Sequence, residues 1–115
     1  MAHIRALSLE EVTTGDTYQF AYAHSWPGSH WSPDSLYLED EAWGIGVLAP
    51  ALSQVFPQFA WYGPQKVPLS QWRQAEALCL AGHPGDPAPE QFFLSVRRWL
   101  AAGNRGAEYF WILGV

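Results

Sequence analysis

The sequence contains one cysteine, Cys79, and one lysine, Lys66, among 115 residues. A single cysteine cannot form an internal disulfide, which is typical of proteins in a reducing compartment. The sequence also has no basic leader followed by a cleavage site, and no apolar run long enough to span a bilayer. We therefore expect a soluble, cytoplasmic protein.

Basic residues are scarce overall, with six Lys and Arg against eleven Asp and Glu and a net charge of −5. Nucleic-acid binding requires clustered bases that neutralise phosphates, so this balance argues against it. The run Gly44-Ile-Gly46 lacks the third glycine of a dinucleotide fingerprint, and no lysine has a P-loop context. The expected helices carry no basic face that would favour a membrane surface.

The acidic charge is concentrated in the first third of the chain. Residues 1–41 hold seven carboxylates and one arginine, a net charge of −6, whereas residues 42–115 hold four acidic and five basic residues, a net charge of +1. Such a distribution suits a basic protein partner, because opposite charges speed encounter. The alternative is a solvated acidic face that keeps the protein soluble.

Aromatic residues are abundant, with seven Trp, five Tyr and six Phe. A chain of 115 residues without repeats or linkers predicts one domain, residues 1–115, with a core supplied largely by these rings. The clearest periodicity places Tyr18, Phe20 and Tyr22 on one face of a strand.

The remaining patterns predict an order of elements. Short strands are expected over 3–7, 17–23, 35–38, 58–62 and 108–113, the last of them buried and central. A capping box at Ser8 predicts a brief helical turn. Helices are expected over 39–55, with Glu39, Asp40 and Glu41 in its first turn and a kink or break near Pro50, then over 68–82 and 89–102. The fold class is therefore α+β, a small mainly antiparallel sheet with about three helices packed on one face.

Segment 24–34 concentrates histidine, tryptophan, proline and a carboxylate in a loop. His24, His30 and Asp34 have the chemistry of zinc ligands, but their spacing matches no standard site. Serines lie beside these histidines, yet a catalytic triad is made by geometry in space and not by adjacency in sequence. Cys79 falls on the apolar side of its helix, as a core residue does. We expect no metal, no cofactor and no catalytic residue.

Binding through an acidic and aromatic surface is the preferred interpretation, because aromatic anchors ringed by charge are typical of protein interfaces. The candidate partner-binding residues are Trp31, Asp34, Tyr37, Glu39, Asp40 and Glu41. In the alternative interpretation the tryptophans of segment 24–34 fold inward over the sheet and leave only the carboxylates exposed.

The runs His24-Ser-Trp-Pro and Trp31-Ser-Pro-Asp-Ser-Leu-Tyr37, with the apolar ending Trp111-Ile-Leu-Gly-Val115, resemble small bacterial proteins. In layout the chain is also similar to immunity proteins of contact-dependent and secreted-toxin systems. The resemblance implies a short, acidic, cytoplasmic α+β protein that binds and neutralises a cognate toxin. It assigns no functional residue, and Arg97, Arg98 and Arg105 depart from a uniformly acidic binder.

Three hypotheses follow from the sequence. The first is a non-enzymatic binder of a basic protein partner, with a toxin domain as that partner. The second is a small enzyme or ligand-binding domain with a pocket under segment 24–34. The third is a structural or regulatory subunit whose interface is the Gly- and Ala-rich helix over 42–55. The sequence does not fix the oligomeric state or the order of the strands.

Overall fold

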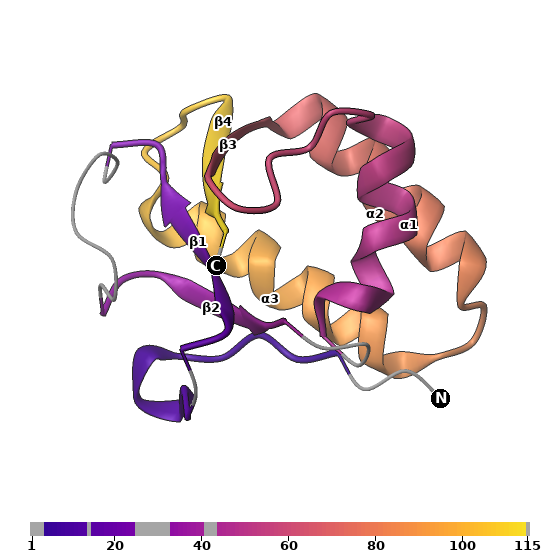
Figure 1. Cartoon of the computed structure of the whole chain (residues 1–115), viewed down its shortest axis with the longest axis horizontal. Helices are drawn as coiled ribbons and strands as arrows, with labels where there is room; N and C mark the ends of the chain where they lie inside the picture. The colour runs from indigo at the N-terminus through magenta and orange to yellow at the C-terminus, as the bar shows by residue number, and fades with distance from the viewer. Residues whose placement is uncertain (1–3, 14, 25–32, 41–43, 115) are drawn as a thin grey trace.

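The computed structural model describes residues 4–13, 15–24, 33–40 and 44–114 (Figure 1). Its elements in chain order are the 3-10 turn η1 (Leu9–Glu11), β1 (Thr17–Tyr22), β2 (Leu36–Glu39), α1 (Ile45–Val55), β3 (Pro64–Pro68), α2 (Leu69–Gly82), α3 (Pro87–Gly103) and β4 (Tyr109–Leu113). The strands gather on one side of the molecule, and α1 and α2 lie side by side on the other.

The four strands form one antiparallel sheet in the order β2-β1-β4-β3. The last strand of the chain, β4, therefore lies at the centre, between β1 and β3, as its apolar sequence predicts. All three helices contribute side chains to one hydrophobic cluster with the sheet. The α+β class with an antiparallel sheet is confirmed.

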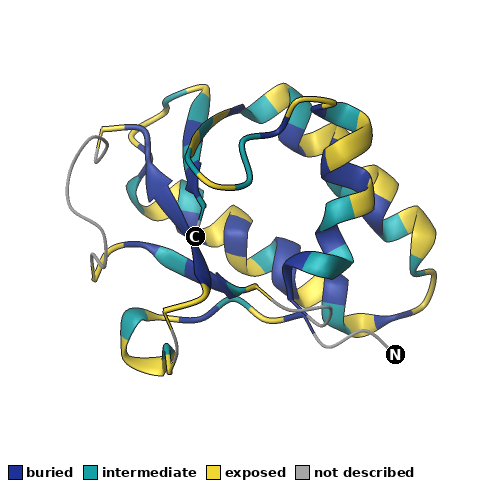
Figure 2. Cartoon of the chain, in the orientation of Figure 1, coloured by how far each residue is buried: buried dark blue, intermediate teal, exposed yellow. Residues whose placement is uncertain are grey.

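The period-2 pattern of β1 is confirmed by its burial. Tyr18, Phe20 and Tyr22 all belong to the core cluster that the sheet shares with the helices. The ribbon of β1 is coloured as buried in Figure 2. The alternate residues Thr17, Gln19 and Ala21 are also buried, so both faces of β1 are removed from solvent. The polar Gln19 is accommodated there because its Nε2 donates a hydrogen bond to Ser35 Oγ at 3.0 Å.

The helix expected over 39–55 begins later than the sequence indicates. Glu39 belongs to β2, where it pairs with Thr17 of β1, and α1 starts at Ile45 with no acidic residue in its first turn. Strand pairing therefore takes precedence over the favourable charge of carboxylates at a helix N-terminus. Of the two outcomes expected near Pro50, a kink or a break, the break is excluded, because the helix continues through Pro50 to Val55.

The strand expected over 58–62 is also wrong. Those residues form turns, with Phe59 N–H bonded to Phe56 O and Trp61 N–H bonded to Phe59 O, both at 3.1 Å. The alternating rings of Phe59 and Trp61 pack on the core from this turn instead of from a ladder. The strand lies at Pro64–Pro68, at the edge of the sheet, where proline is tolerated.

Helices α2 and α3 agree closely with their sequence patterns. Trp72, Ala75 and Cys79 form the buried stripe of α2. Helix α3 begins at Pro87, two residues before the predicted start, because the Asp86 side chain caps it by accepting a hydrogen bond from Ala88 N–H at 3.1 Å. Proline is suited to this first turn, where backbone N–H groups have no partner within the helix.

The N-terminal region holds the predicted capping box but no extended strand over 4–7. Glu11 accepts hydrogen bonds from the Ser8 N–H at 3.0 Å and from the Ser8 hydroxyl at 3.1 Å. Both bonds lower the pKa of Glu11. Of the expected strand, only Leu7 pairs with the sheet, through two backbone bonds to Tyr37.

Candidate functional site

The strand order brings separate parts of the chain together at each end of the sheet. At one end, β1 begins after Asp16, β2 ends at Glu39, and β4 ends beside the turn that precedes β3. We call Asp16, Glu39, Asp40 and Tyr62 at this end the acidic end. The opposite end holds the last residues of β1, the first of β2 and Glu108 before β4.

At the acidic end, a backbone hydrogen bond joins Asp16, which precedes β1, to Asp40, which follows β2. Asp40 N–H donates to Asp16 O at 3.0 Å, directly beyond the Thr17 and Glu39 pair. Asp16 and Asp40 are exposed and Glu39 is half-buried. Among the residues that the structure describes, no arginine or lysine forms a salt bridge with Glu39 or Asp40, so their charge is available to a partner.

Tyr62 is the aromatic residue of the acidic end, and sequence analysis did not select it. Its side chain is 88% exposed, which is exceptional for a large ring. Burial raises the pKa of Tyr18, and the nearby Asp40 carboxylate and Tyr62 phenol raise it further. Tyr62 follows Trp61, whose ring contacts Tyr18, and Asp40 follows Glu39 of β2, so both residues lie at the end of the sheet where β1 begins.

The backbone that carries Tyr62 is held firmly against the sheet. Gly114 N–H donates to Gly63 O at 3.0 Å, and a side chain at Gly114 would collide with the Trp61 carbonyl. The Trp61 ring in turn meets Tyr18 edge to face, with ring centroids 6.3 Å apart. The ring of Tyr62 therefore projects from a turn whose backbone is already ordered, so binding would restrict mainly the two side-chain torsions of the tyrosine.

The four predicted partner-binding residues that the structure describes do not share one exposed surface. Tyr37 is 1% exposed and lies inside the fold, so its expected place at an exposed interface is wrong. Tyr37 and its neighbour Leu38 are both buried, and Leu7 pairs with the Tyr37 backbone, whereas sequence proximity grouped Tyr37 with the carboxylates. Trp31 and Glu41 lie outside the described residues.

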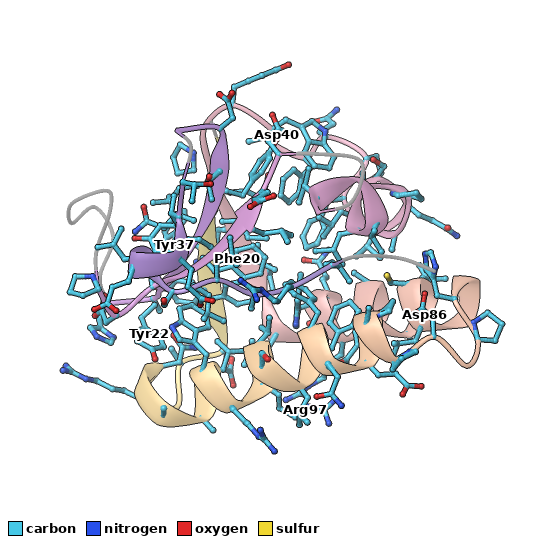
Figure 3. All side chains as sticks on the ribbon, turned by 90° about the horizontal axis from the view of Figure 1, so that it is seen from below. Phe20, Tyr22, Tyr37, Asp40, Asp86 and Arg97 are labelled. Carbon is cyan, nitrogen blue, oxygen red and sulfur yellow. The ribbon has the colours of Figure 1, made fainter. Side chains whose placement is uncertain are left out.

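Asp34 is separated from the acidic end by the length of β2. The six residues from Asp34 to Asp40 span about 20 Å of extended chain. Figure 3 shows Asp40 and Tyr22 at opposite ends of the sheet. Asp34 lies at the Tyr22 end. Burial raises the pKa of Tyr22, and the negative charge of Asp34 raises it further. Of the four predicted residues that the structure describes, Glu39 and Asp40 are brought together.

At the end opposite the acidic end, three rings form a stack. The Tyr22 ring lies parallel to His24 at 5.6 Å and to Trp99 at 4.3 Å, each with an interplanar angle of 11°. Trp99 Nε1 donates to Asp34 O at 2.8 Å, and the Tyr22 hydroxyl donates to Trp99 O at 2.8 Å. The two ends of segment 24–34 are thereby attached to the C-terminal half of α3.

Neither metal binding nor nucleophilic chemistry gains support from the described geometry. In the ranges given above, no three His, Cys, Asp or Glu residues are grouped so that they could hold a metal ion, while His30 and the serines of segment 25–32 lie outside those ranges. Burial raises the pKa of Cys79 to about 11, which suppresses the nucleophilic thiolate.

Comparison with protein-family models, with curated proteins and with solved structures finds no match to this chain. Within the described part of the chain, no helix has both the length and the apolar character required to cross a membrane.

Proposed function

We propose that this protein is a non-enzymatic protein-binding domain that engages a basic partner through the acidic end. The observation that carries the proposal is the 88%-exposed Tyr62 at the same end of the sheet as Asp40, whose carboxylate forms no salt bridge with any lysine or arginine that the structure describes. The resemblance to immunity proteins supports a toxin domain as the partner, and the cytoplasm as the place where it is neutralised.

Charge and aromatic surface have separate roles in this proposal. Carboxylates at the rim of an interface mainly raise the association rate, because they attract the basic partner over distances of about 10 Å at moderate salt. An exposed tyrosine instead contributes contact area within the complex, as hot-spot residues do, and therefore mainly lowers the dissociation rate. Changes at Asp40 and at Tyr62 should therefore alter different rate constants.

The experiment begins with the gene encoded directly upstream, since an immunity protein is expected beside a large secreted protein with a variable C-terminal domain. That C-terminal domain is purified, and its association with this protein is followed by surface plasmon resonance at low salt and at about 0.5 M salt. The variants Asp40→Lys and Glu108→Lys are compared. They change the net charge equally, but Glu108 lies at the opposite end of the sheet.

We expect Asp40→Lys to slow association about threefold to tenfold at low salt, with little effect at high salt and a smaller effect from Glu108→Lys. Tyr62→Ala should accelerate dissociation about tenfold or more. Its matched control is Leu78→Ala, which removes another exposed apolar side chain, on α2. Binding that ignores salt, Asp40 and Tyr62 alike would refute the acidic end as the interface.

The interface expected on the helix over 42–55 is less well supported. Helix α1 buries Ile45, Leu48, Ala51 and Leu52 within the chain's own core, and it packs mainly against α2. Its apolar side is therefore already covered within one molecule.

A further inference from the structure

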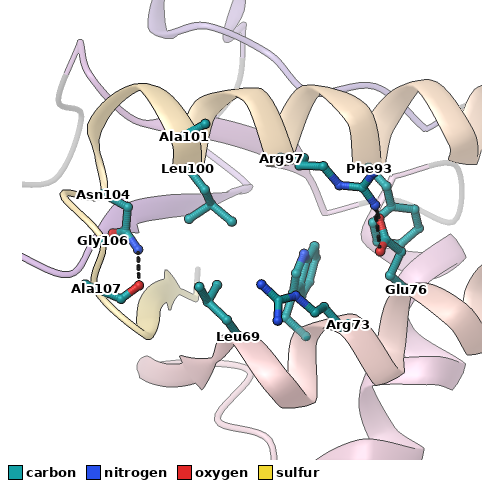
Figure 4. A pocket seen from close by; sticks show the side chains of 11 residues that line it. Leu69, Arg73, Glu76, Phe93, Arg97, Leu100, Ala101, Asn104, Gly106 and Ala107 are labelled. Carbon is teal, nitrogen blue, oxygen red and sulfur yellow. Dashed lines mark hydrogen bonds and ion pairs between the residues drawn. The ribbon is translucent and has the colours of Figure 1, made fainter.

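A pocket of about 630 Å³ opens between α2 and α3, away from the acidic end (Figure 4). Its volume falls in the range typical of sites for small organic molecules. It is lined by Leu69, Trp72, Arg73, Glu76, Phe93, Arg97, Leu100, Ala101, Asn104, Gly106 and Ala107.

Apolar side chains form the floor of this pocket and part of each of its two walls. Trp72 and Phe93 are buried, and their ring centroids lie 5.5 Å apart, so they form a packed floor. Leu69 from α2 and Leu100 from α3 face one another across the opening in Figure 4. Half-buried leucines on facing helices leave apolar surface that a ligand of similar character would cover.

One side of the pocket is closed by a rigid turn after α3. The buried Asn104 side chain accepts a hydrogen bond from Ala23 N–H at 3.0 Å and donates to the carbonyls of Ala107 and Tyr109 at 3.2 and 3.0 Å. These bonds fix the turn to β1 and β4. The pocket is therefore largely preformed, which reduces the ordering required when a ligand binds.

The charged groups of the pocket are not balanced. Arg97 donates to both carboxylate oxygens of Glu76 at 3.1 and 3.2 Å, and this pair neutralises both charges. Arg73 also lines the pocket, and among the described residues no carboxylate lies within salt-bridge distance of it. The local charge is thus +1, in a protein whose net charge is −5.

We propose that this pocket binds an organic monoanion with an apolar body, namely a carboxylate of the alkyl or aryl class. The apolar body would lie on Leu69, Phe93 and Leu100, and the carboxylate would accept hydrogen bonds from the Arg73 guanidinium. A polyanion such as a nucleotide is disfavoured, because Glu76 lies in the same pocket and only one guanidinium is uncompensated.

The probe is octanoate, compared with octanol and octyltrimethylammonium, which share its chain but are neutral and cationic. Binding is followed by chemical-shift changes of backbone amides in the ¹⁵N-labelled protein, at ligand concentrations up to about 10 mM so that millimolar affinity is detected. We expect saturable shifts in α2, α3 and the turn at 104–107, with octanoate binding at least about tenfold more tightly than octanol.

The variants separate the charge from the cavity. Arg73→Gln should weaken octanoate binding about tenfold or more and leave octanol binding unchanged. Arg98→Gln is the matched control, since Arg98 is an exposed arginine of α3 that does not line the pocket. Ala101→Phe, at an exposed helical position on the pocket's rim, should reduce the binding of both octanoate and octanol by occupying the space.

The proposal is overturned if octanoate produces no saturable shifts, if octanol and octanoate bind equally, or if Arg73→Gln behaves as Arg98→Gln does. It is independent of the function proposed above, because Asp40→Lys and Tyr62→Ala should leave octanoate binding unchanged. Failure at the acidic end would therefore not affect this pocket, and the reverse also holds.

Discussion

At the scale of single residues, Gly103 has a role that its position in the sequence conceals. The sequence pattern predicts that Gly103 ends a helix, and Gly103 is the last residue of α3. A side chain there would collide with the Tyr22 ring. That ring cannot move aside cheaply, since it is stacked between His24 and Trp99 and its hydroxyl is bonded to Trp99 O.

Gly103→Ala should therefore destabilise the protein by about 1–3 kcal/mol, although alanine is the better helix former. The matched control is Gly82→Ala, at the last residue of α2, where a methyl group meets no other atom within 4 Å. That control should be neutral or stabilising by up to about 1 kcal/mol. Urea denaturation of both variants tests this, and equal stability of the two would contradict the close packing of Gly103 on Tyr22.

Cys79 supplies a second residue-scale prediction. Burial raises its pKa to about 11 from an ordinary value of 9.0, and the thiol donates a weak hydrogen bond to Val47 O at 3.5 Å. At pH 8 about one thiol in a thousand is then ionised, against about one in ten in the unfolded chain. We expect a thiol reagent to react at least about 100-fold more slowly with the native protein than with the urea-unfolded protein.

The same shift has a consequence for stability. The folded state retains the Cys79 proton above the pH at which the unfolded chain releases it, so this contribution is complete below pH 9 and is lost between pH 9 and about 11. Unfolding free energies measured across this interval should fall with rising pH, and less steeply in Cys79→Ala.

In the labelling experiment, a rate for the native protein within tenfold of the rate for the unfolded protein would refute the burial of the Cys79 thiol.

At the scale of elements, the sequence correctly predicts the helices and strands whose hydrophobic pattern is accompanied by a capping or terminating residue nearby in the chain. The alternating rings of β1, the buried stripe of α2 and the capping box at Ser8 all agree with the structure. The errors occur where long-range pairing decides. Glu39 belongs to β2 because it pairs with Thr17 of β1. The residue types at 39–41 carry no information about this distant partner.

The edge strand β3 begins and ends with a proline, Pro64 and Pro68. Gly63 and Leu69 bond to residues beside β4, so the alternation directs the backbone groups of Pro64, Lys66 and Pro68 away from the sheet. Both prolines lack an N–H there, and Gln65 Nε2 donates to Lys66 O at 2.9 Å. The edge offers few free groups to a second chain, which protects it from edge-to-edge pairing.

Restoring free backbone N–H and C=O groups on the outer edge of β3 should promote self-association. The double variant Pro64→Thr with Gln65→Ala returns an outward N–H and frees the Lys66 carbonyl. We expect concentration-dependent oligomers by size-exclusion chromatography with light scattering. The matched control is Pro57→Thr with Gln58→Ala, in the exposed turn before β3. If both double variants behave as the unmodified protein does, proline is not what protects this edge.

At the scale of the whole molecule, strands and helices share one cluster of buried side chains. Phe20 of β1, Trp72 of α2 and Phe110 of β4 illustrate this, with ring centroids 5.3–5.7 Å apart for each pair. A single shared core of this kind favours cooperative unfolding, because no element can leave without exposing the others.

Urea unfolding should therefore follow one transition, with the same midpoint by tryptophan fluorescence and by far-ultraviolet circular dichroism. Hydrogen exchange should be slowest in the central strands β1 and β4, and faster at η1, which buries no residue. Two separate midpoints would contradict a single cooperative core and would divide the chain into independent units.

The sequence by itself determined the fold class, the two longest helices, the central and buried character of β4, and the acidic bias of residues 1–41. These features depend on local periodicity, capping and composition, which adjacent residues express without a distant partner. Only the tertiary structure decided the strand order and the composition of the acidic end. Strand pairing separated Asp34 from Asp40 by the length of β2, and it placed Tyr62, from a segment more than twenty residues later in the chain, at the same end of the sheet as Asp40.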